Sequence, residues 1–142
     1  MKCLKPTLAM AIAIGIVSAT VTAGDEEIDT GPAMSAAQAW LAEVDSGRYG
    51  QSWEDASEYL RNATPKEQWE TTLRAARAKL GLVIARKMRG ANYVKDPPNA
   101  PAGEYLLITY DTHFENKPLA AEIVTPTRDK DGKWKVADYS IR

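Results

Sequence analysis

Apolar residues follow two different periods along the chain, and the change from one to the other divides it into two halves. Up to Leu80 they recur three or four residues apart, which is the spacing of one face of an α-helix. From Leu82 onward they fall largely on every second residue, the alternation of a strand with one buried face. Gly81, a residue type that commonly ends helices, lies at the change. The pattern predicts a helical N-terminal half and a β-rich C-terminal half.

The first predicted helix covers residues 36–46. Ser35 and Gln38 have the spacing of a capping box, in which the serine side chain accepts a hydrogen bond from the third backbone amide. The apolar face of this helix is Ala37, Trp40, Leu41 and Val44. A short second helix is expected over residues 53–61, because the same spacing is repeated by Tyr49, Trp53, Ala56 and Leu60.

The third predicted helix has the clearest boundaries. Thr64 is placed to cap it, and Pro65 fits the first helical position, where no backbone amide is needed. Gly81 is expected to end it. Its buried stripe is predicted to be Trp69, Leu73, Ala76 and Leu80. Each of the three helices thus has one apolar face that needs a second layer to cover it.

Four strands are expected in the second half, over residues 82–93, 104–114, 120–128 and 133–141. Turn-forming residues separate them, including three prolines between residues 96 and 103, which cannot join a strand ladder, and Asp131-Gly132, which suits a tight hairpin. In the last strand a bulge near Ala137-Asp138 is predicted. It would bring four apolar side chains onto one face: Trp134, Val136, Tyr139 and Ile141.

Helices followed by strands predict an α+β fold. We expect three N-terminal helices packed on one face of a curved, mostly antiparallel four-stranded sheet, since neither layer can bury its apolar face alone. At 142 residues the chain has room for one domain, which we place at residues 35–142. Residues 24–34 are acidic and turn-rich, and we expect them to form a flexible leader.

The first 23 residues are typical of a secretory signal peptide. Two lysines precede an apolar stretch over residues 8–17, and small residues follow it up to Ala23. A membrane-spanning helix needs about 20 apolar residues, and Ser18 and Thr20 interrupt this stretch early. We therefore expect cleavage after Ala23, no stable membrane span in the mature protein, and a periplasmic or secreted location.

Removal of the signal peptide changes both the charge and the redox chemistry of the chain. It takes away two lysines and leaves 16 basic against 19 acidic residues, a net charge of −3. Nucleic acid is not an expected partner, because phosphate binding needs a concentrated basic surface. The single cysteine, Cys3, leaves with the signal peptide, so the mature chain lacks disulfides, a thiol nucleophile and cysteine-ligated zinc.

Asp111 and the only histidine, His113, are the first candidates for chemistry. They share one face of a predicted strand, about 7 Å apart at Cα. A metal site needs three or four ligands, so carboxylates such as Glu122 would have to complete it, and we expect no metal and no other cofactor. An acid–base pair would need a pocket, whereas this face becomes more polar toward the strand end. We interpret the two residues as a polar strand edge near a turn.

Arg86 and Glu122 are charged residues whose strand neighbours are apolar. Arg86 shares its expected face with Ile84 and Met88, and Glu122 shares its face with Val124. One interpretation is a pocket ion pair that orients a small polar ligand. The other, which we favour, is a structural salt bridge or a solvent-facing pair, because ion-pair networks also arise for structural reasons.

Four stretches carry a resemblance to a known family: AWLAEVDSGRYGQSW, KEQW, GEYLLITYDTHFENK and DGKWKVADYSIR. They resemble the bacterial family called domain of unknown function 4019, over nearly the whole mature chain. The resemblance implies an exported single-domain bacterial protein and gives no catalytic residues. One departure is the loop DPPNAPAGEY, where the family leads us to expect a leucine-proline-glycine turn. The order of elements also resembles the nuclear-transport-factor-like cone, a fold that includes ketosteroid isomerase.

These observations favour a non-catalytic binding or protein-interaction module. It would bind an unidentified small apolar or amphipathic ligand inside the cone, or an envelope protein across its sheet, and it could form a homodimer through the open sheet face. The alternative is a small cofactor-free lyase or isomerase of the ketosteroid-isomerase type with a carboxylate base. An enzyme needs a titratable group in the space between the third helix and the sheet, whereas a binding module does not.

The cleavage site is directly testable. We expect the exported protein to begin at Gly24, because the small residues before it are those that signal peptidase accepts. N-terminal sequencing of the exported protein checks this, and a mature chain that retains Lys2 and Lys5 would show that the segment is an uncleaved anchor.

Overall fold

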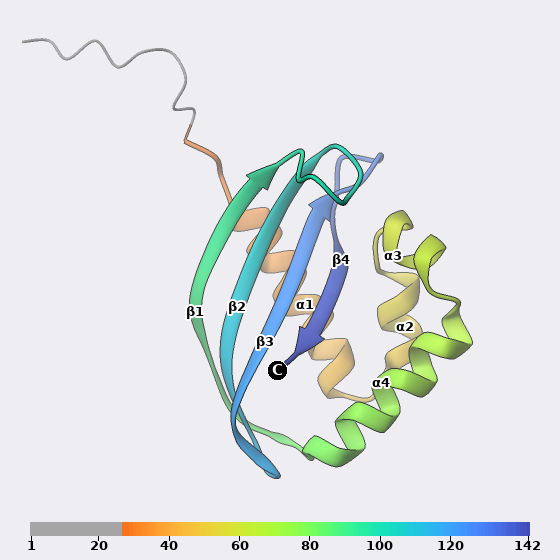
Figure 1. Cartoon of the computed structure of the whole chain (residues 1–142), viewed down its shortest axis with the longest axis vertical. Coiled ribbons are helices and arrows are strands. Elements are labelled where there is room, and N and C mark those ends of the chain that lie inside the picture. Colours follow the sequence, from red (N-terminus) through yellow and green to blue (C-terminus); the bar gives the residue numbers. More distant parts are fainter. Residues whose placement is uncertain (1–26) are drawn as a thin grey trace, which may run out of the picture.

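The computed structural model describes residues 27–142 and confirms the predicted α+β class (Figure 1). The predicted signal peptide and Ala23 lie outside the described residues. The helices are α1 (Gly31–Asp45), α2 (Tyr49–Glu54), α3 (Glu58–Ala63) and α4 (Lys66–Leu80). The strands are β1 (Val83–Lys95), β2 (Glu104–Phe114), β3 (Lys117–Arg128) and β4 (Trp134–Ile141). No helix among residues 27–142 combines the length and the apolar character needed to cross a bilayer.

The first helix begins earlier than predicted. α1 starts at Gly31, so the capping box proposed at Ser35 is wrong, and residues 31–34 belong to the helix and not to the leader. Pro32 lies in the first turn, where a missing backbone amide costs no hydrogen bond. Ala33 is fully buried in the core, so this turn is held by packing.

The second predicted helix is in fact two short helices, α2 and α3. The helical conformation is interrupted at Ser57. The hydroxyl of Ser57 accepts a hydrogen bond from the amide of Leu60 at 3.2 Å and so caps α3. The amide of Ser57 donates to the carbonyl of Val136 in β4 at 2.9 Å. The interruption thus ties the helical layer to one edge of the sheet.

The sheet is an antiparallel meander in the order β1-β2-β3-β4. The core face of β2 consists of alternate residues that are all buried: Leu106, Ile108, Tyr110, Thr112 and Phe114. The predicted bulge in β4 is confirmed. Thr125 pairs with Asp138 and Pro126 pairs with Val136, which leaves Ala137 as the extra residue.

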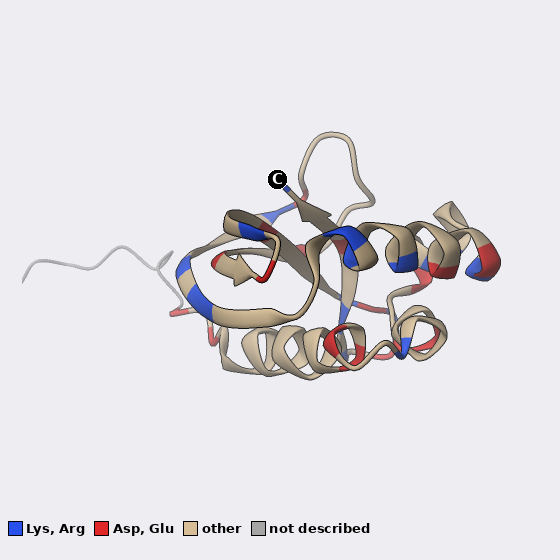
Figure 2. Ribbon diagram, turned by 90° about the horizontal axis from the view of Figure 1, so that it is seen from below, with Lys and Arg blue, Asp and Glu red and all other residues tan. Residues whose placement is uncertain are grey.

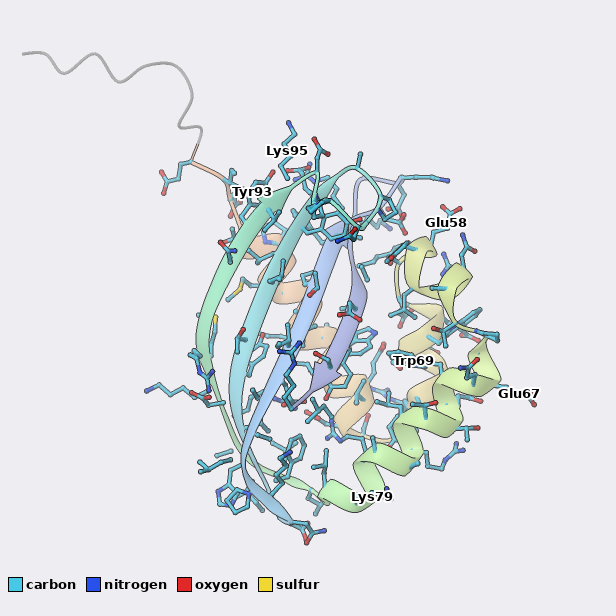
Figure 3. The ribbon with its side chains drawn as sticks, in the orientation of Figure 1. Glu58, Glu67, Trp69, Lys79, Tyr93 and Lys95 are labelled. Carbon is cyan, nitrogen blue, oxygen red and sulfur yellow. The ribbon has the colours of Figure 1, made fainter. Side chains whose placement is uncertain are left out.

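The helices cover only one face of the sheet, here called the inner face. α1 crosses this face over β3 and β4 (Figure 1). Its Trp40 is buried, donates its indole N–H to the carbonyl of Ser52 at 2.8 Å, and packs its ring against Tyr139 with centroids 5.1 Å apart. α4 packs mainly on α2, and Figure 3 shows Trp69 on the side of α4 that faces the sheet. Within residues 27–142, no helix lies on the outer face.

Two adjacent leucines on β2 test this assignment of faces. Leu106 points into the core and is 1 % exposed, whereas Leu107 points outward and is 38 % exposed. Leu106→Ala should lower the free energy of unfolding by about 2–5 kcal/mol, because it leaves a cavity in the core. Leu107→Ala should lower it by no more than about 1 kcal/mol. Urea denaturation measures both values, and equal losses would contradict the assignment.

Candidate functional site

Six polar side chains from six different elements meet between the helices and the sheet. We call them the inner ion network: Asp45 of α1, Arg77 of α4, Arg86 of β1, Thr112 of β2, Glu122 of β3 and Tyr139 of β4. Glu122 is 0 % exposed and Arg77 is 6 % exposed. Burying charges in this way costs several kcal/mol per ion unless each charge is paired and hydrogen-bonded.

Glu122 is the centre of the inner ion network. Its Oε1 accepts a hydrogen bond from Arg86 Nε at 2.7 Å and another from the hydroxyl of Thr112. Its Oε2 accepts from the hydroxyl of Tyr139 and lies 3.8 Å from Arg77 Nη1. Both carboxylate oxygens are therefore occupied by donors from the protein itself.

Asp45 joins the two arginines on the helical side. Its carboxylate accepts from Arg86 through two nitrogens, at 2.7 and 3.0 Å, which is the bidentate geometry that suits a guanidinium. Arg77 Nη2 also donates to Asp45 at 2.7 Å, and Arg77 Nη1 donates to the Tyr139 hydroxyl at 3.3 Å. Two cations thus meet two anions, and the formal charges of the network cancel.

The local environment shifts the pKa values of these groups in ways that keep their charges. Burial disfavours the charge on Arg86, but hydrogen bonds to Asp45 and Glu122 outweigh it and raise the pKa of the guanidinium. Burial likewise acts to raise the pKa of Asp45, and the hydrogen bonds from both arginines lower it overall. Burial, followed by the nearby charge of Glu122, raises the pKa of Tyr139 well above its usual range. Asp45, Arg86 and Arg77 therefore remain ionised, and Tyr139 remains protonated, around neutral pH.

The space between α4 and the sheet is an apolar cleft of about 180 Å³. Its lining is Trp69, Thr72, Leu73, Ala76, Tyr139, Ser140 and Ile141. Tyr139 is the only titratable side chain in that lining, and its hydroxyl is bonded to Glu122. A carboxylate base does not line this cleft.

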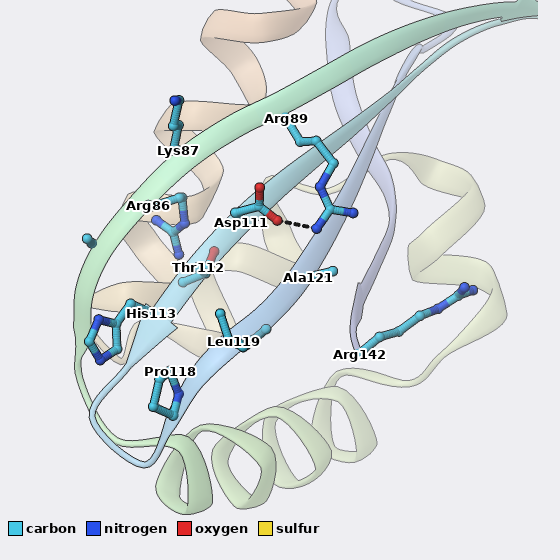
Figure 4. Close-up of a pocket in the computed structure, with 12 residues that line it drawn as sticks. Arg86, Lys87, Arg89, Asp111, Thr112, His113, Pro118, Leu119, Ala121 and Arg142 are labelled. Carbon is cyan, nitrogen blue, oxygen red and sulfur yellow. Dashed lines mark hydrogen bonds and ion pairs between the residues drawn. The ribbon is translucent and has the colours of Figure 1, made fainter.

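Asp111 and His113 lie on the outer face of the sheet. Asp111 forms an ion pair with Arg89, and both side chains are more than half exposed (Figure 4). Figure 4 shows that His113 lies along the same strand, with Asp111 bound to Arg89 and not to His113. The two residues share one surface, therefore, but Asp111 is engaged by an arginine that the sequence analysis had not paired with it.

Asp111 and His113 line a hollow of about 510 Å³, which we call the outer groove. Its lining includes the small residues Ala85 and Ala121, and Figure 4 shows Ala121 on β3. Charged residues among its lining are Arg86, Lys87, Arg89, Asp111 and Arg142. Leu119, at its rim, is 91 % exposed, the largest exposure among the large apolar residues of the described chain.

Neither region holds an evident metal site. Within residues 27–142, no group of three or more His, Cys, Asp or Glu side chains is arranged to hold an ion. The donors around Glu122 are guanidinium and hydroxyl groups, which leave its oxygens no room for a cation.

Two further carboxyl groups, those of Glu43 and Asp55, interact with each other and were not predicted from the sequence. Glu43 of α1 shares a hydrogen bond with Asp55, which follows α2. Burial, then this hydrogen bond and the charge of Asp55, raise the pKa of Glu43 to about 7. The same hydrogen bond lowers the pKa of Asp55, helped by one from Gln51 at 3.0 Å. Nothing in the local sequence marks two acids twelve positions apart as partners.

Two members of the inner ion network, Arg86 and Glu122, were candidates from the sequence, and the structure brings them together. The other four members were not predicted. Arg77 occupies the buried stripe of α4 that Trp69 and Leu73 begin, and Thr112 falls on the apolar face of β2, so each carried the same signal of a polar residue at an apolar position. Asp45 carried no such signal, because it lies at the end of its helix.

Comparison with known proteins gives one match. The model of a family described as "Protein of unknown function (DUF4019)" matches residues 36–139, which confirms the resemblance that the sequence stretches indicated. No curated protein and no solved structure matches the chain. The likeness to the nuclear-transport-factor-like cone stays a prediction.

The inner ion network predicts a large effect of Glu122→Ala. This change should lower the free energy of unfolding by about 3–5 kcal/mol, because Asp45 would then be the one anion of the network left to neutralise two buried arginines, Arg86 and Arg77. Lys130→Ala is the control, since it breaks the exposed pair of Lys130 with Glu58 and should cost no more than about 1 kcal/mol. Chemical denaturation measures both, and a small loss in the Glu122 variant would show that the network contributes little to stability.

The carboxyl pair predicts a pH dependence of stability. The pKa of Glu43 is about 7 in the folded chain, whereas the ordinary value is 4.5. Between pH 4.5 and pH 7 the folded state therefore binds more protons than the unfolded state. The free energy of unfolding should therefore fall as pH rises from about 4.5 to about 7, by at most about 1.4 kcal/mol per pH unit.

Glu43→Gln should remove this fall, because the amide resembles the protonated acid at every pH. Glu67→Gln, on the exposed surface of α4, is the matched control and should retain the fall seen in the unmodified protein. Denaturation at pH 5, 6 and 7 compares the three proteins, and identical profiles would show that the pair does not titrate in this range.

Proposed function

We propose that this chain, which belongs to the DUF4019 family, is a non-catalytic binding module that contacts another protein through the outer face of its sheet. The observation that carries the proposal is Leu119, an apolar side chain left 91 % exposed at the rim of the outer groove. Exposing a large apolar side chain to water is unfavourable, so its burial against a partner would stabilise the complex.

The inner face supports the proposal because its charged groups have no free capacity for a ligand. Its charged groups are paired with one another, so they offer no unpaired ion to a ligand. The apolar cleft beside α4 has about 180 Å³, whereas sites for small organic ligands have about 300–1,000 Å³. A whole small ligand between the layers is therefore a weaker proposal than a protein partner outside them.

The outer face, by contrast, has the composition of a contact surface. Two exposed apolar residues line the outer groove, Pro118 and Leu119. Leu107 adds a further partly exposed apolar side chain on the same face of β2. Apolar residues rimmed by charges are typical of protein interaction sites.

An enzyme of the ketosteroid-isomerase type is supported less well. Its base would have to be a carboxylate that faces a cavity, and Glu122 is the buried carboxylate of the sheet. Both oxygens of Glu122 accept hydrogen bonds from the protein, and Glu122 does not line the cleft beside α4. A base in this state would first have to break its bonds to Arg86 and Tyr139.

The location we propose is the periplasm or the exterior of the cell. The support is the N-terminal sequence, in which two lysines, an apolar stretch and small residues ending at Ala23 follow one another. The partner would then be another exported or envelope protein.

Site-specific photocrosslinking in the native cells tests the outer face. A photoreactive amino acid replaces Leu119 or Leu107 on the outer face, or Thr71 on the exposed surface of α4 as the matched control. We expect the same protein to be crosslinked from both outer positions and not from the control, because only the outer face is covered by the partner.

Three results would overturn the proposal. They are no adduct from either outer position, equal adducts from Thr71, or adducts that contain only a second copy of this chain. Mass spectrometry of the adducts distinguishes them, and the last result would show a homodimer in place of a complex with another protein.

A further inference from the structure

We infer, resting on the proposed function, that the outer groove binds an extended acidic segment of the partner in which two carboxylates flank an apolar residue. The inference stands on three features of the outer groove: an excess of cations, the spacing of those cations across the strands, and the apolar rim between them.

The cations of the outer groove outnumber its acids. Its lining has four cations, which are Arg86, Lys87, Arg89 and Arg142, and a single carboxylate, Asp111. Arg86 is paired with Asp45 and Glu122 of the inner ion network, and Arg89 is paired with Asp111. Lys87 and Arg142 therefore remain to receive the carboxylates of a partner. The chain as a whole has a formal charge of −1, so this local positive charge is opposite in sign to that of the molecule.

A bulge in β1 concentrates the positive charge on the outer face. Met88 pairs with Tyr110 and Gly90 pairs with Thr109, so Arg89 is an extra residue in the strand. The extra residue turns Arg89 to the outer side, where it meets Asp111 beside Lys87. Figure 2 shows the basic residues along β1, and β1 contains no acidic residue.

The strand register places the two receiving cations at opposite ends of the outer groove (Figure 4). Lys87 pairs with Asp111, and Asp111 pairs with Ala121. Ala121 in turn exchanges two backbone hydrogen bonds with Arg142, each 2.9 Å. Lys87 and Arg142 are thus three strand spacings apart in one row, or ~14 Å at Cα.

An extended segment matches this separation. Its residues advance by about 3.3–3.6 Å each, so side chains four positions apart are separated by ~14 Å and point to the same side. The residue midway between them also points to that side and would meet Leu119 and Ala121. The recognised pattern is therefore an acid, an apolar residue two positions later, and a second acid two positions after that.

Charge also argues against a second copy of this chain as the occupant. Two outer grooves brought face to face would place Lys87 and Arg142 of each copy near cations of the other, and like charges in an interface are unfavourable. An acidic segment instead forms charge-assisted hydrogen bonds with both ends.

The test uses a blocked synthetic peptide with the sequence Ser-Glu-Ser-Leu-Ser-Glu-Ser and the full mature chain. Backbone amide shifts in an NMR titration report both the affinity and the site. We expect shifts at His113 and Ala121, and an affinity that weakens as salt is added, because the receiving cations are exposed. A peptide with lysine in place of glutamate should not bind.

Charge-reversal variants supply the decisive comparison. Lys87→Glu and Arg142→Glu should each weaken binding about tenfold or more, which corresponds to the loss of one charge-assisted contact. Lys79→Glu is the matched control, because Lys79 is an exposed cation on α4 (Figure 3), and it should leave the affinity unchanged. All three positions are on the surface, so the melting temperatures should stay close to that of the unmodified chain.

The inference is overturned if the lysine peptide binds as well as the glutamate peptide, if the shifts map outside the outer groove, or if all three variants bind equally. If crosslinking from Leu119 and Leu107 succeeds while the peptide fails, only the acidic character of the partner is wrong. If crosslinking fails, the proposed function itself is wrong.

Discussion

The burial of Glu122 is the constraint on which the rest of this structure depends. A carboxylate with no exposure to water is tolerated only where donors replace its hydration. Here the donors come from β1, β2 and β4, and Arg86 and Arg77 extend the network to Asp45 of α1. A shift of any one of these elements would leave a buried charge without its partner. We infer that the network selects one register of the sheet and one placement of the helices, beyond what apolar packing would specify.

This constraint makes the two faces of the sheet chemically different. On the inner face, charged groups bind one another, and aromatic rings such as Trp40 and Tyr139 fill the space around them. On the outer face, Lys87 and Arg142 remain exposed, and small residues such as Ala85 and Ala121 line the outer groove beside the longer side chains. The charged groups on the inner face of the sheet are thus paired with one another, whereas cations on its outer face stay exposed to solvent.

The fold class could be predicted from the sequence because it depends on local periodicity, and the change of period near Gly81 is strong. The details that failed depend on context that periodicity does not contain. α1 begins at Gly31 because Ala33 is buried in the core. The helix predicted after Gly47 is divided into α2 and α3 because the amide of Ser57 donates a hydrogen bond to Val136, some eighty residues later in the sequence.

The candidate sites show the same limit. Arg86 and Glu122 stood out as charges among apolar neighbours, but their partner Asp45 came from a distant helix with no local mark. The outer groove was missed for a different reason. The third strand was predicted to begin at residue 120, whereas β3 begins at Lys117, so Leu119 was left outside the predicted strand and its place on the outer face was not foreseen.

The bond from the amide of Ser57 to Val136 has a consequence for the free borders of the sheet. It places α3 against β4, whereas no described element lies along the other border, formed by the thirteen residues of β1. Unpaired strand borders invite pairing with other chains, and charged side chains are a common protection against it. β1 carries four basic residues and no acidic one, so two copies that met border to border would place cation against cation. These charges thereby disfavour edge-to-edge association of the sheets of two molecules.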